Sequence, residues 1–136
     1  MESGSPNLVG HERFVFEPRH VDKPWGYELL WALAEDYCGK ILFVRAGEAL
    51  SLQFHRVKDE SWYVLEGRAE LELGDPGQKG LDVAVIGPGD AFRFRPGTVH
   101  RVRALEDIRV LEVSTPHLDD VVRLEDSYGR EGTSDP

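Results

Sequence analysis

The central part of the chain consists of short segments in which apolar and polar residues alternate. The alternation is strict at residues 69–73 (Ala-Glu-Leu-Glu-Leu) and 92–95 (Phe-Arg-Phe-Arg), and it places successive side chains on opposite faces of a strand. Seven more short segments are rich in β-branched and aromatic residues: GYELLWAL, KILFVRA, LSLQFHR, SWYVLEG, DVAVIG, HRVRAL and IRVLEVS. Glycine and proline turn signals separate them, so the pattern predicts an all-β protein of about nine strands.

Short strands at this spacing favour a closed or double-sheet barrel such as a jelly roll. The 136 residues fit a single domain. We expect a flexible N-terminal segment at 1–15, a barrel at 16–130 and a disordered tail at 131–136. The one segment with a weak helical pattern is 117–125, and Trp31 is expected in the core.

Composition narrows the classes of partner. The chain has 16 basic and 25 acidic residues and a net charge of −9, which disfavours nucleic acid and anionic membrane surfaces. A small anionic substrate stays compatible with this charge if a few basic residues converge locally. Cys38 is the single cysteine, which excludes an intramolecular disulfide and a cysteine-based zinc site. With no apolar run long enough for a membrane helix and no signal-peptide pattern, we expect the cytoplasm.

Four side chains form a candidate metal site. Gln53 and His55 lie two apart in one predicted strand and share a face. Glu60 follows across a short turn, where antiparallel pairing can bring it to the same face, and His100 begins another strand. Together they would form a cage with open coordination positions. On spacing alone, the alternative is two ordinary surface histidines and a solvated turn glutamate.

The glycines around these residues resemble the motifs of the cupin superfamily. The first motif is Gly, five residues, His-x-His, three or four residues, Glu, six residues and Gly. Its positions are occupied by Gly47, Gln53, His55, Glu60 and Gly67, with Gln in place of the first His. The second motif is matched by Gly89, Arg95, Gly97 and His100, with Arg95 in place of the usual Pro. The resemblance implies a double-stranded β-helix that binds a metal through Gln53, His55, Glu60 and His100.

Within that superfamily the chain resembles the type II mannose-6-phosphate isomerase domain over residues 20–130. Three segments carry this resemblance: Lys-Pro-Trp-Gly-Tyr-Glu at 23–28, the hairpin at 50–62, and Val-Arg-Leu-Glu-Asp-Ser-Tyr-Gly-Arg at 122–130. The chain departs from the family at Arg56, Val57 and Lys58, where additional histidines are common. It also has no guanylyltransferase half, so nucleotide transfer is not expected.

The resemblance implies interconversion of mannose 6-phosphate and fructose 6-phosphate through an enediolate, whose charge a divalent ion stabilises as a Lewis acid. Three neutral ligands and one carboxylate suit Zn²⁺ first, with Mn²⁺, Co²⁺, Ni²⁺ or Fe²⁺ also compatible. The proton transfer needs a base. The candidates are Glu112, Lys40 and His117, and residue parity alone does not choose among them.

The same resemblance implies a set of substrate-binding residues. Arg123 and Arg130 would bind the phosphate through their guanidinium groups, with Arg123 also counted as catalytic. Tyr128 belongs to the same signature, and Trp62 is expected either against the sugar or in the core. By analogy with small cupins, we expect a homodimer that pairs through edge strands or swapped N-terminal strands. The alternative functions are a metal-dependent dioxygenase with Fe²⁺ and a non-catalytic sugar- or small-molecule-binding module.

Overall fold

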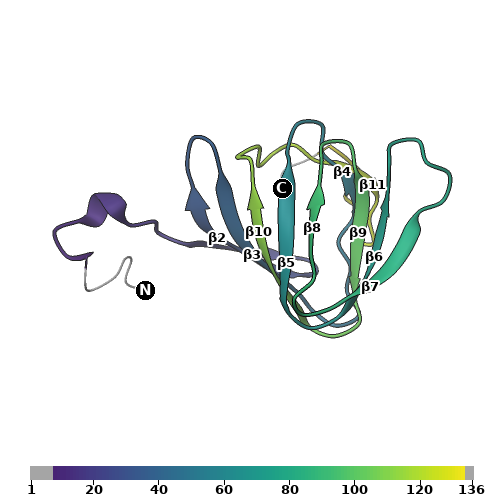
Figure 1. Cartoon of the computed structure of the whole chain (residues 1–136), viewed down its shortest axis with the longest axis horizontal. Coiled ribbons are helices and arrows are strands. Elements are labelled where there is room, and N and C mark those ends of the chain that lie inside the picture. Colours follow the sequence, from purple (N-terminus) through teal and green to yellow (C-terminus); the bar gives the residue numbers. More distant parts are fainter. Residues whose placement is uncertain (1–7, 134–136) are drawn as a thin grey trace.

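A computed structural model describes residues 8–133, which form two six-stranded antiparallel sheets that face each other (Figure 1). The first sheet has the order β1 (Arg19–Lys23), β2 (Gly26–Leu33), β3 (Cys38–Val44), β10 (Ile108–Ser114), β5 (Glu60–Glu66) and β8 (Ala91–Phe94). The second has the order β12 (Gly132–Thr133), β11 (Val122–Glu125), β4 (Leu52–Phe54), β9 (Val99–Ala104), β6 (Ala69–Gly74) and β7 (Asp82–Ile86). The predicted all-β jelly-roll class is confirmed.

Strand register divides the barrel interior into an apolar end and a polar end. On the inner face of β10, Ile108 and Val110 come first and are buried in the core cluster. The next inward position is Glu112, which lies opposite Lys40 of β3 and Trp62 of β5. Burying charged groups costs free energy unless they are paired. A buried polar layer above a complete apolar core therefore indicates a functional site.

One glycine shows how closely the turns at the apolar end pack. Gly67, in the turn between β5 and β6, has a φ of +86°. A Cβ at this position would lie 2.0 Å from the carbonyl oxygen of Asp107. Glycine is required here because both the backbone conformation and the close approach exclude a side chain.

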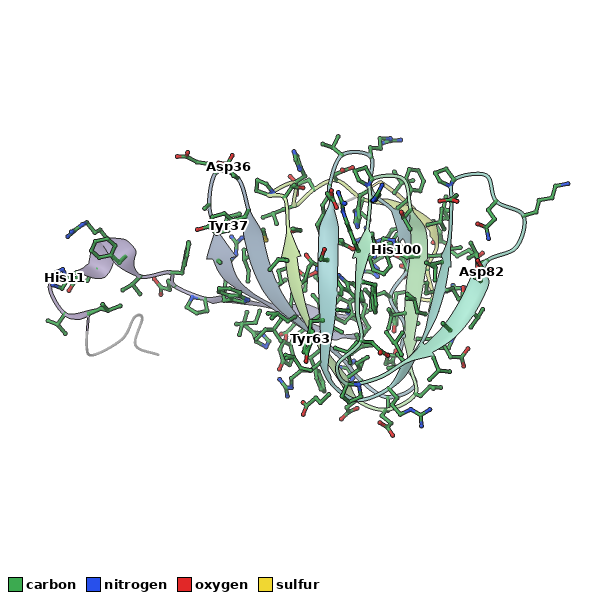
Figure 2. The ribbon with its side chains drawn as sticks, in the orientation of Figure 1. His11, Asp36, Tyr37, Tyr63, Asp82 and His100 are labelled. Atoms are coloured by element: carbon green, nitrogen blue, oxygen red, sulfur yellow. The ribbon has the colours of Figure 1, made fainter. Side chains whose placement is uncertain are left out.

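The ends of the chain depart in part from the expected boundaries. Residues 1–7 and 134–136, which belong to the predicted flexible ends, lie outside the described residues. Residues 8–18 form an arm that leaves the barrel at β1 and contains the 3-10 helix η2 (Glu12–Phe14) (Figure 1). Figure 2 places His11 on this arm, away from the sheets. At the other end, strand pairing continues past residue 131, because Gly132 and Thr133 pair with β11.

Two local predictions were wrong. The segment 117–125 is not helical: turns lead into β11, which pairs with β4. This pairing across the sheet overrides a weak local preference for helix. Trp31 is not in the core, since it is 38% exposed. It lies on the outer face of the first sheet, where a Cβ at Gly39 would be 2.6 Å from its ring.

Candidate metal centre and its pocket

Three potential metal ligands converge at the polar end of the barrel. His55 follows β4, Glu60 begins β5, and His100 lies in β9. Their ligand atoms all lie within 4.8 Å of one another, and all three residues are buried. The Nε2 atoms of His55 and His100 are 3.6 and 3.3 Å from Glu60 Oε1. These atoms come from two sheets, so the barrel closure itself brings them together.

Hydrogen bonds on the far side of each imidazole fix the orientation of both rings. His55 Nδ1 lies 2.5 Å from the carbonyl oxygen of Asp120, and His100 Nδ1 lies 2.9 Å from that of Thr98. A carbonyl oxygen can only accept, so the neutral rings carry their protons on Nδ1. The Nε2 lone pairs then point toward Glu60. The ring of Phe94 stacks on His100 at a centroid distance of 4.1 Å and restrains it further.

This donor set fits a divalent cation. Glu60 Oε1 and His100 Nε2 are buried without a hydrogen-bond partner. Two imidazole lone pairs and a carboxylate oxygen that face one another repel unless a positive charge lies between them. Histidine and carboxylate ligands suit Zn²⁺ and neighbouring transition metals. Bonds from Nδ1 to backbone carbonyls are the usual second contact of metal-binding histidines.

Gln53 is placed beside this cluster by strand register. In the second sheet, Gln53 of β4 lies directly opposite His100 on one side and Arg123 of β11 on the other. Residues directly opposite each other in antiparallel strands share a face. Gln53 lines the pocket, and this row puts its amide on the same side of the sheet as the His100 imidazole.

A buried chain of charges extends from Glu60. Lys58 Nζ lies 2.9 Å from Glu60 Oε2 and 3.2 Å from Glu112 Oε2. The indole Nε1 of Trp62 donates to Glu112 Oε1 at 3.2 Å. Burial alone would lower the pKa of Lys58, but the Glu112 and Glu60 carboxylates raise it above its usual value. Burial raises the pKa of Glu60, yet Lys58 brings it well below the usual range. Lys58 and Glu60 are therefore both charged.

Asp120 ties the loop after β4 to the C-terminal segment. Its carboxylate accepts the backbone N–H groups of Arg56, Val57 and Lys58 at 2.7–3.0 Å. Partial burial raises the pKa of Asp120, but these three N–H groups lower it below its usual value. The backbone carbonyl of Asp120 also bonds His55 Nδ1. Asp120 therefore fixes both the loop after β4 and the imidazole of a proposed metal ligand.

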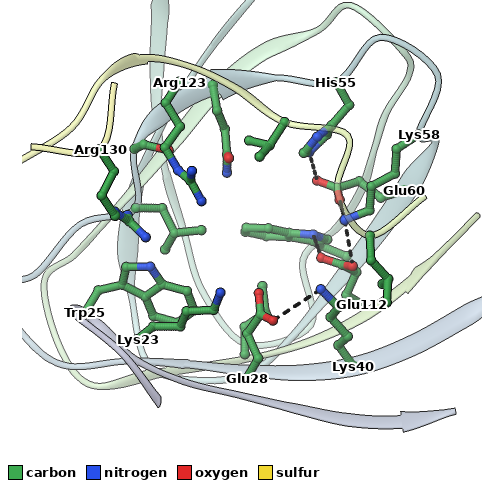
Figure 3. Close-up of a pocket in the computed structure, with 17 residues that line it drawn as sticks. Lys23, Trp25, Glu28, Lys40, His55, Lys58, Glu60, Glu112, Arg123 and Arg130 are labelled. Carbon is green, nitrogen blue, oxygen red and sulfur yellow. Dashed lines mark hydrogen bonds and ion pairs between the residues drawn. The ribbon is translucent and has the colours of Figure 1, made fainter. Parts of the chain in front are cut away.

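Basic side chains gather on the side of the pocket away from the ligands. Figure 3 shows Arg123, Arg130 and Lys23 on one side, with His55 and Glu60 on the other. Burial lowers the pKa of Lys23, and the positive charges of Arg123 and Arg130 contribute to this lowering. The pocket lining contains five Lys and Arg residues and three Glu residues. Its formal charge is thus positive, although the whole chain carries −9.

Between these two sides lies an acidic residue from β2. Glu28 Oε2 forms an ion pair with Lys40 Nζ at 3.3 Å. Figure 3 shows the Glu28 carboxylate directed into the pocket. Glu112, in contrast, has both oxygens engaged, one by Trp62 and one by Lys58. Among the carboxylates that line the pocket, Glu28 has an oxygen available to a ligand and is not part of the metal cluster.

The structure brings most of the predicted site residues together. Eight of them line the pocket: Lys40, Gln53, His55, Glu60, Trp62, Glu112, Arg123 and Arg130. His100 is buried behind that lining, against Glu60. Tyr128 lies outside the lining, where its hydroxyl donates to Glu48 and its ring packs near Arg130. His117 is exposed and bonded to Thr115.

Sequence reasoning missed three charged residues of the pocket: Lys23, Glu28 and Lys58. Lys58 was noted only as a departure from the family pattern. Glu28 and Lys23 belong to the segment 23–28, whose resemblance was recognised without assigning roles to its charged residues. The alternation of inward and outward residues along β2 could have identified Glu28. This residue lies opposite Leu42, an inward-facing core residue of β3.

Comparisons with known proteins place the chain among similar sequences. Residues 41–114 match the family model "Cupin domain". The chain is 33% identical over 117 residues to the xanthan biosynthesis protein XanB of Xanthomonas campestris, covering 82% of this chain and 24% of that protein. It is 34% identical over 118 residues to the mannose-1-phosphate guanylyltransferase ManC of Salmonella typhimurium, covering 82% and 23%. The chain thus spans about a quarter of the length of these relatives.

Solved structures agree with this assignment. KdgF from Halomonas sp. superposes with a TM-score of 0.62 at 26% identity, covering 73% of this chain and 88% of that one. The oxalate decarboxylase OxdC of Bacillus subtilis superposes with a TM-score of 0.67 at 20% identity, covering 79% and 30%; this second likeness concerns the fold alone. Within residues 8–133, no helix is long and apolar enough to cross a membrane.

Proposed function

Because the chain belongs to the cupin domain family, we propose that it is a metal-dependent isomerase of a sugar phosphate. The proposed pair is mannose 6-phosphate and fructose 6-phosphate. The relatives support a role in sugar metabolism, since several carry the name mannose-1-phosphate guanylyltransferase. They are longer proteins of which this chain matches about a quarter, so the substrate is inferred from the pocket.

The observation that carries this proposal is the separation of charge within the pocket. Arg123, Arg130 and Lys23 form a basic side (Figure 3). Guanidinium groups bind phosphate oxygens in pairs, so this side suits the phosphate of the substrate. The sugar would then extend across the pocket, with its carbonyl end toward the ligand cluster. A positive pocket in an acidic protein also favours small anions over nucleic acid.

The metal would be held by Gln53, His55, Glu60 and His100. When bound, a divalent ion acts as a Lewis acid that stabilises negative charge on the oxygens of carbons 1 and 2. Zn²⁺ is the proposed ion, and Mn²⁺, Co²⁺, Ni²⁺ and Fe²⁺ also suit this donor set. Three neutral ligands and one carboxylate leave the site with a net positive charge. Lys58 holds the second oxygen of Glu60 and so keeps the first directed at the ion.

We assign the proton transfer to Glu28. Its carboxylate would take the proton from carbon 2 of the aldose and return it to carbon 1. The hydroxyl proton on the oxygen of carbon 2 would pass to the oxygen of carbon 1, which leaves a ketose and regenerates the carboxylate. Lys40 pairs with Glu28 Oε2, which orients the carboxylate. Of the candidates drawn from the sequence, Glu112 is held at both oxygens and Lys40 is engaged with Glu28. A positioned base of this kind contributes roughly 10² to 10⁴ in rate.

The test is an isomerase assay on the metal-loaded protein. We expect mannose 6-phosphate to yield fructose 6-phosphate, with Glu28→Gln lowering kcat by roughly 10² to 10⁴ while metal content is unchanged. Glu112→Gln serves as the matched carboxylate control and should lower kcat less. If the protein binds hexose phosphates but turns none over, it is a binding module. Oxygen consumption by the Fe²⁺ form would instead indicate a dioxygenase.

Location in the cytoplasm stays a prediction.

A further inference from the structure

The segment that joins β10 to β11 lies between the two sides of the pocket. This linking segment, residues 115–121, contributes Leu118 and Val121 to the pocket lining. It leads directly into β11, which carries Arg123. Figure 3 shows Arg123 on the basic side of the pocket and His55 on the ligand side. A segment that bonds to one side and continues covalently into the other is able to connect binding events at the two.

Asp120 fixes the linking segment to the ligand side. Its backbone carbonyl accepts a hydrogen bond from His55 Nδ1 at 2.5 Å. Its carboxylate accepts the backbone N–H groups of residues 56–58 at 2.7–3.0 Å. Loss of the second contact of a metal-binding histidine typically weakens metal affinity by roughly 10- to 100-fold. The position of Asp120 therefore bears directly on the affinity for a cation.

Strand pairing carries the position of Asp120 to the basic side. β11 begins at Val122, two residues after Asp120, and Val122 lies opposite Phe54 of β4. Arg123 lies opposite Gln53, and the register shifts beyond it. The regular part of this ladder is thus short, and Asp120 holds the end that is next to the ligands. The buried Arg123 therefore depends on Asp120 for its place in the pocket.

Arg130, the other guanidinium of the basic side, is held by separate contacts. Asp126 accepts hydrogen bonds from its Nε and from one of its terminal nitrogens at 2.8 and 3.1 Å. The hydroxyl of Tyr128 donates to Glu48, which precedes β4. The basic side thus has one guanidinium whose position is tied to the ligand side through Asp120, and one that is held by its own neighbours in the chain.

We propose that Asp120 is a positioning residue through which metal binding and phosphate binding strengthen each other. With a cation on Nε2, the His55 ring becomes a stronger Nδ1–H donor to the Asp120 carbonyl. That bond then holds the start of β11 and, with it, Arg123. In the reverse direction, a phosphate on Arg123 holds β11 and the carbonyl that orients His55. The inference rests on the proposed function, because it takes a phosphate on the basic side as its premise.

Calorimetric titration of the full chain with Zn²⁺ and with mannitol 1-phosphate tests this linkage. The second compound is an alditol phosphate without a carbonyl group, so it cannot be isomerised. We expect each ligand to increase the affinity for the other by the same factor, in the range of about 5 to 150, since linkage is reciprocal. In Asp120→Asn an N–H donor replaces one carboxylate oxygen, so this factor should fall by about threefold or more. The Zn²⁺ affinity of the same variant should be roughly 10- to 100-fold lower.

Two matched variants separate the linkage from general effects of charge. Asp119→Asn removes the same charge at the neighbouring, exposed position and should leave both affinities and the factor unchanged. Asp126→Asn should weaken mannitol 1-phosphate equally with and without Zn²⁺, because the Asp126 carboxylate holds Arg130. Direct attraction between the cation and the phosphate persists in all of these variants, so the loss in Asp120→Asn measures the contribution of Asp120.

Amide hydrogen exchange of the wild type gives a second measurement that needs no variant. Zn²⁺ alone should slow exchange of the β11 amides. Mannitol 1-phosphate alone should slow exchange at residues 56–58, whose N–H groups bond the Asp120 carboxylate. If each ligand protects only its own side of the pocket, or if Asp120→Asn keeps the full wild-type factor, the proposal is wrong.

Turnover of mannose 6-phosphate, measured on the same preparations, separates this inference from the proposed function. Linked binding without turnover would refute the isomerase and leave the role of Asp120 standing. Turnover with independent binding of the two ligands would refute the linkage alone. Failure of mannitol 1-phosphate to bind either the metal-free or the metal-loaded protein would also overturn the linkage.

Discussion

Replacing Lys58 by methionine tests whether the buried charges are organised around a cation. Lys58 Nζ forms ion pairs with both Glu60 Oε2 and Glu112 Oε2. Its side chain is 8% exposed, and the side chains of the two glutamates are 1% and 4% exposed. Methionine keeps the length and the apolar stem but removes the charge. The variant leaves two carboxylates buried side by side without the ammonium group between them.

The expected cost in the metal-free protein is large. Removing one partner of a buried ion pair costs about 3–5 kcal/mol, because the remaining charge stays desolvated. Little discount for solvent screening applies at this level of burial. For a domain of this size, the loss corresponds to a decrease in Tm of roughly 10–20 °C. Thermal or denaturant unfolding after chelation measures it directly.

Metal should recover part of this loss. A ligand that binds only the native state stabilises it by about 2.7 kcal/mol at a hundredfold excess over its Kd. Without Lys58, the Glu60 carboxylate gives its whole charge to the cation. We therefore expect the metal to bind the variant more tightly than the wild type and to raise its Tm by more. Titration calorimetry gives the two affinities.

Lys40→Met is the matched control. Lys40 is 5% exposed at its side chain and also pairs with a carboxylate, but this carboxylate belongs to Glu28, which is not a proposed metal ligand. Its replacement should destabilise the protein equally with and without metal. If Lys58→Met behaves in the same way, so that its cost does not depend on metal, the reasoning that joins Lys58 to the ligand cluster is refuted.

Three further predictions follow from local geometry. Chelation of the wild type should lower its Tm, because the facing imidazole and carboxylate groups lose the cation that separates their lone pairs; an unchanged melting curve in excess chelator would contradict the metal site. Asp126→Asn should raise KM for the sugar phosphate more than it lowers kcat, since Asp126 holds the Arg130 guanidinium at 2.8 and 3.1 Å; steady-state kinetics separates the two effects. Gly67→Ala should lower the free energy of unfolding by several kcal/mol more than the control Gly47→Ala. Both glycines have a positive φ, but only at Gly67 would the new Cβ meet backbone atoms, because at Gly47 it meets nothing within 4 Å. Equal denaturation midpoints for the two variants would show that the close approach at residue 67 is relieved without cost.

The fold and the convergence of His55, Glu60 and His100 could be predicted because both have a signal in the sequence. Alternation at residues 69–73 and 92–95 gives strands without any tertiary information. The spacing of Gln53, His55 and Glu60 within one hairpin needs only the two-residue period of a strand. His100 was proposed because it begins another predicted strand, and the match to the second cupin motif supported it. The structure then brings His55, Glu60 and His100 within 4.8 Å of one another.

Several of the missed features depend on strand register and on strand pairing. Whether Glu28 faces the pocket is decided by the register of β2 against β3, where a bulge lies between Leu30 and Ala32. Trp31 lies at the same bulge. It was expected in the core, but it lies on the outer face of the sheet. The segment 117–125 has no strong local pattern, so its pairing with β4 could not be read from the sequence.

The central strand β10 connects the buried charges of the pocket to the rest of the first sheet. β10 is a central strand that pairs with β3 and β5. Its inward positions include Glu112 and its outward positions include Val113. Holding a charged layer inside a barrel costs free energy that the local contacts of that layer only partly offset. The pairing of β10 with β3 and β5 adds to this support, because it places Glu112 opposite Lys40 and Trp62. Through Lys58, the same support reaches the carboxylate of Glu60.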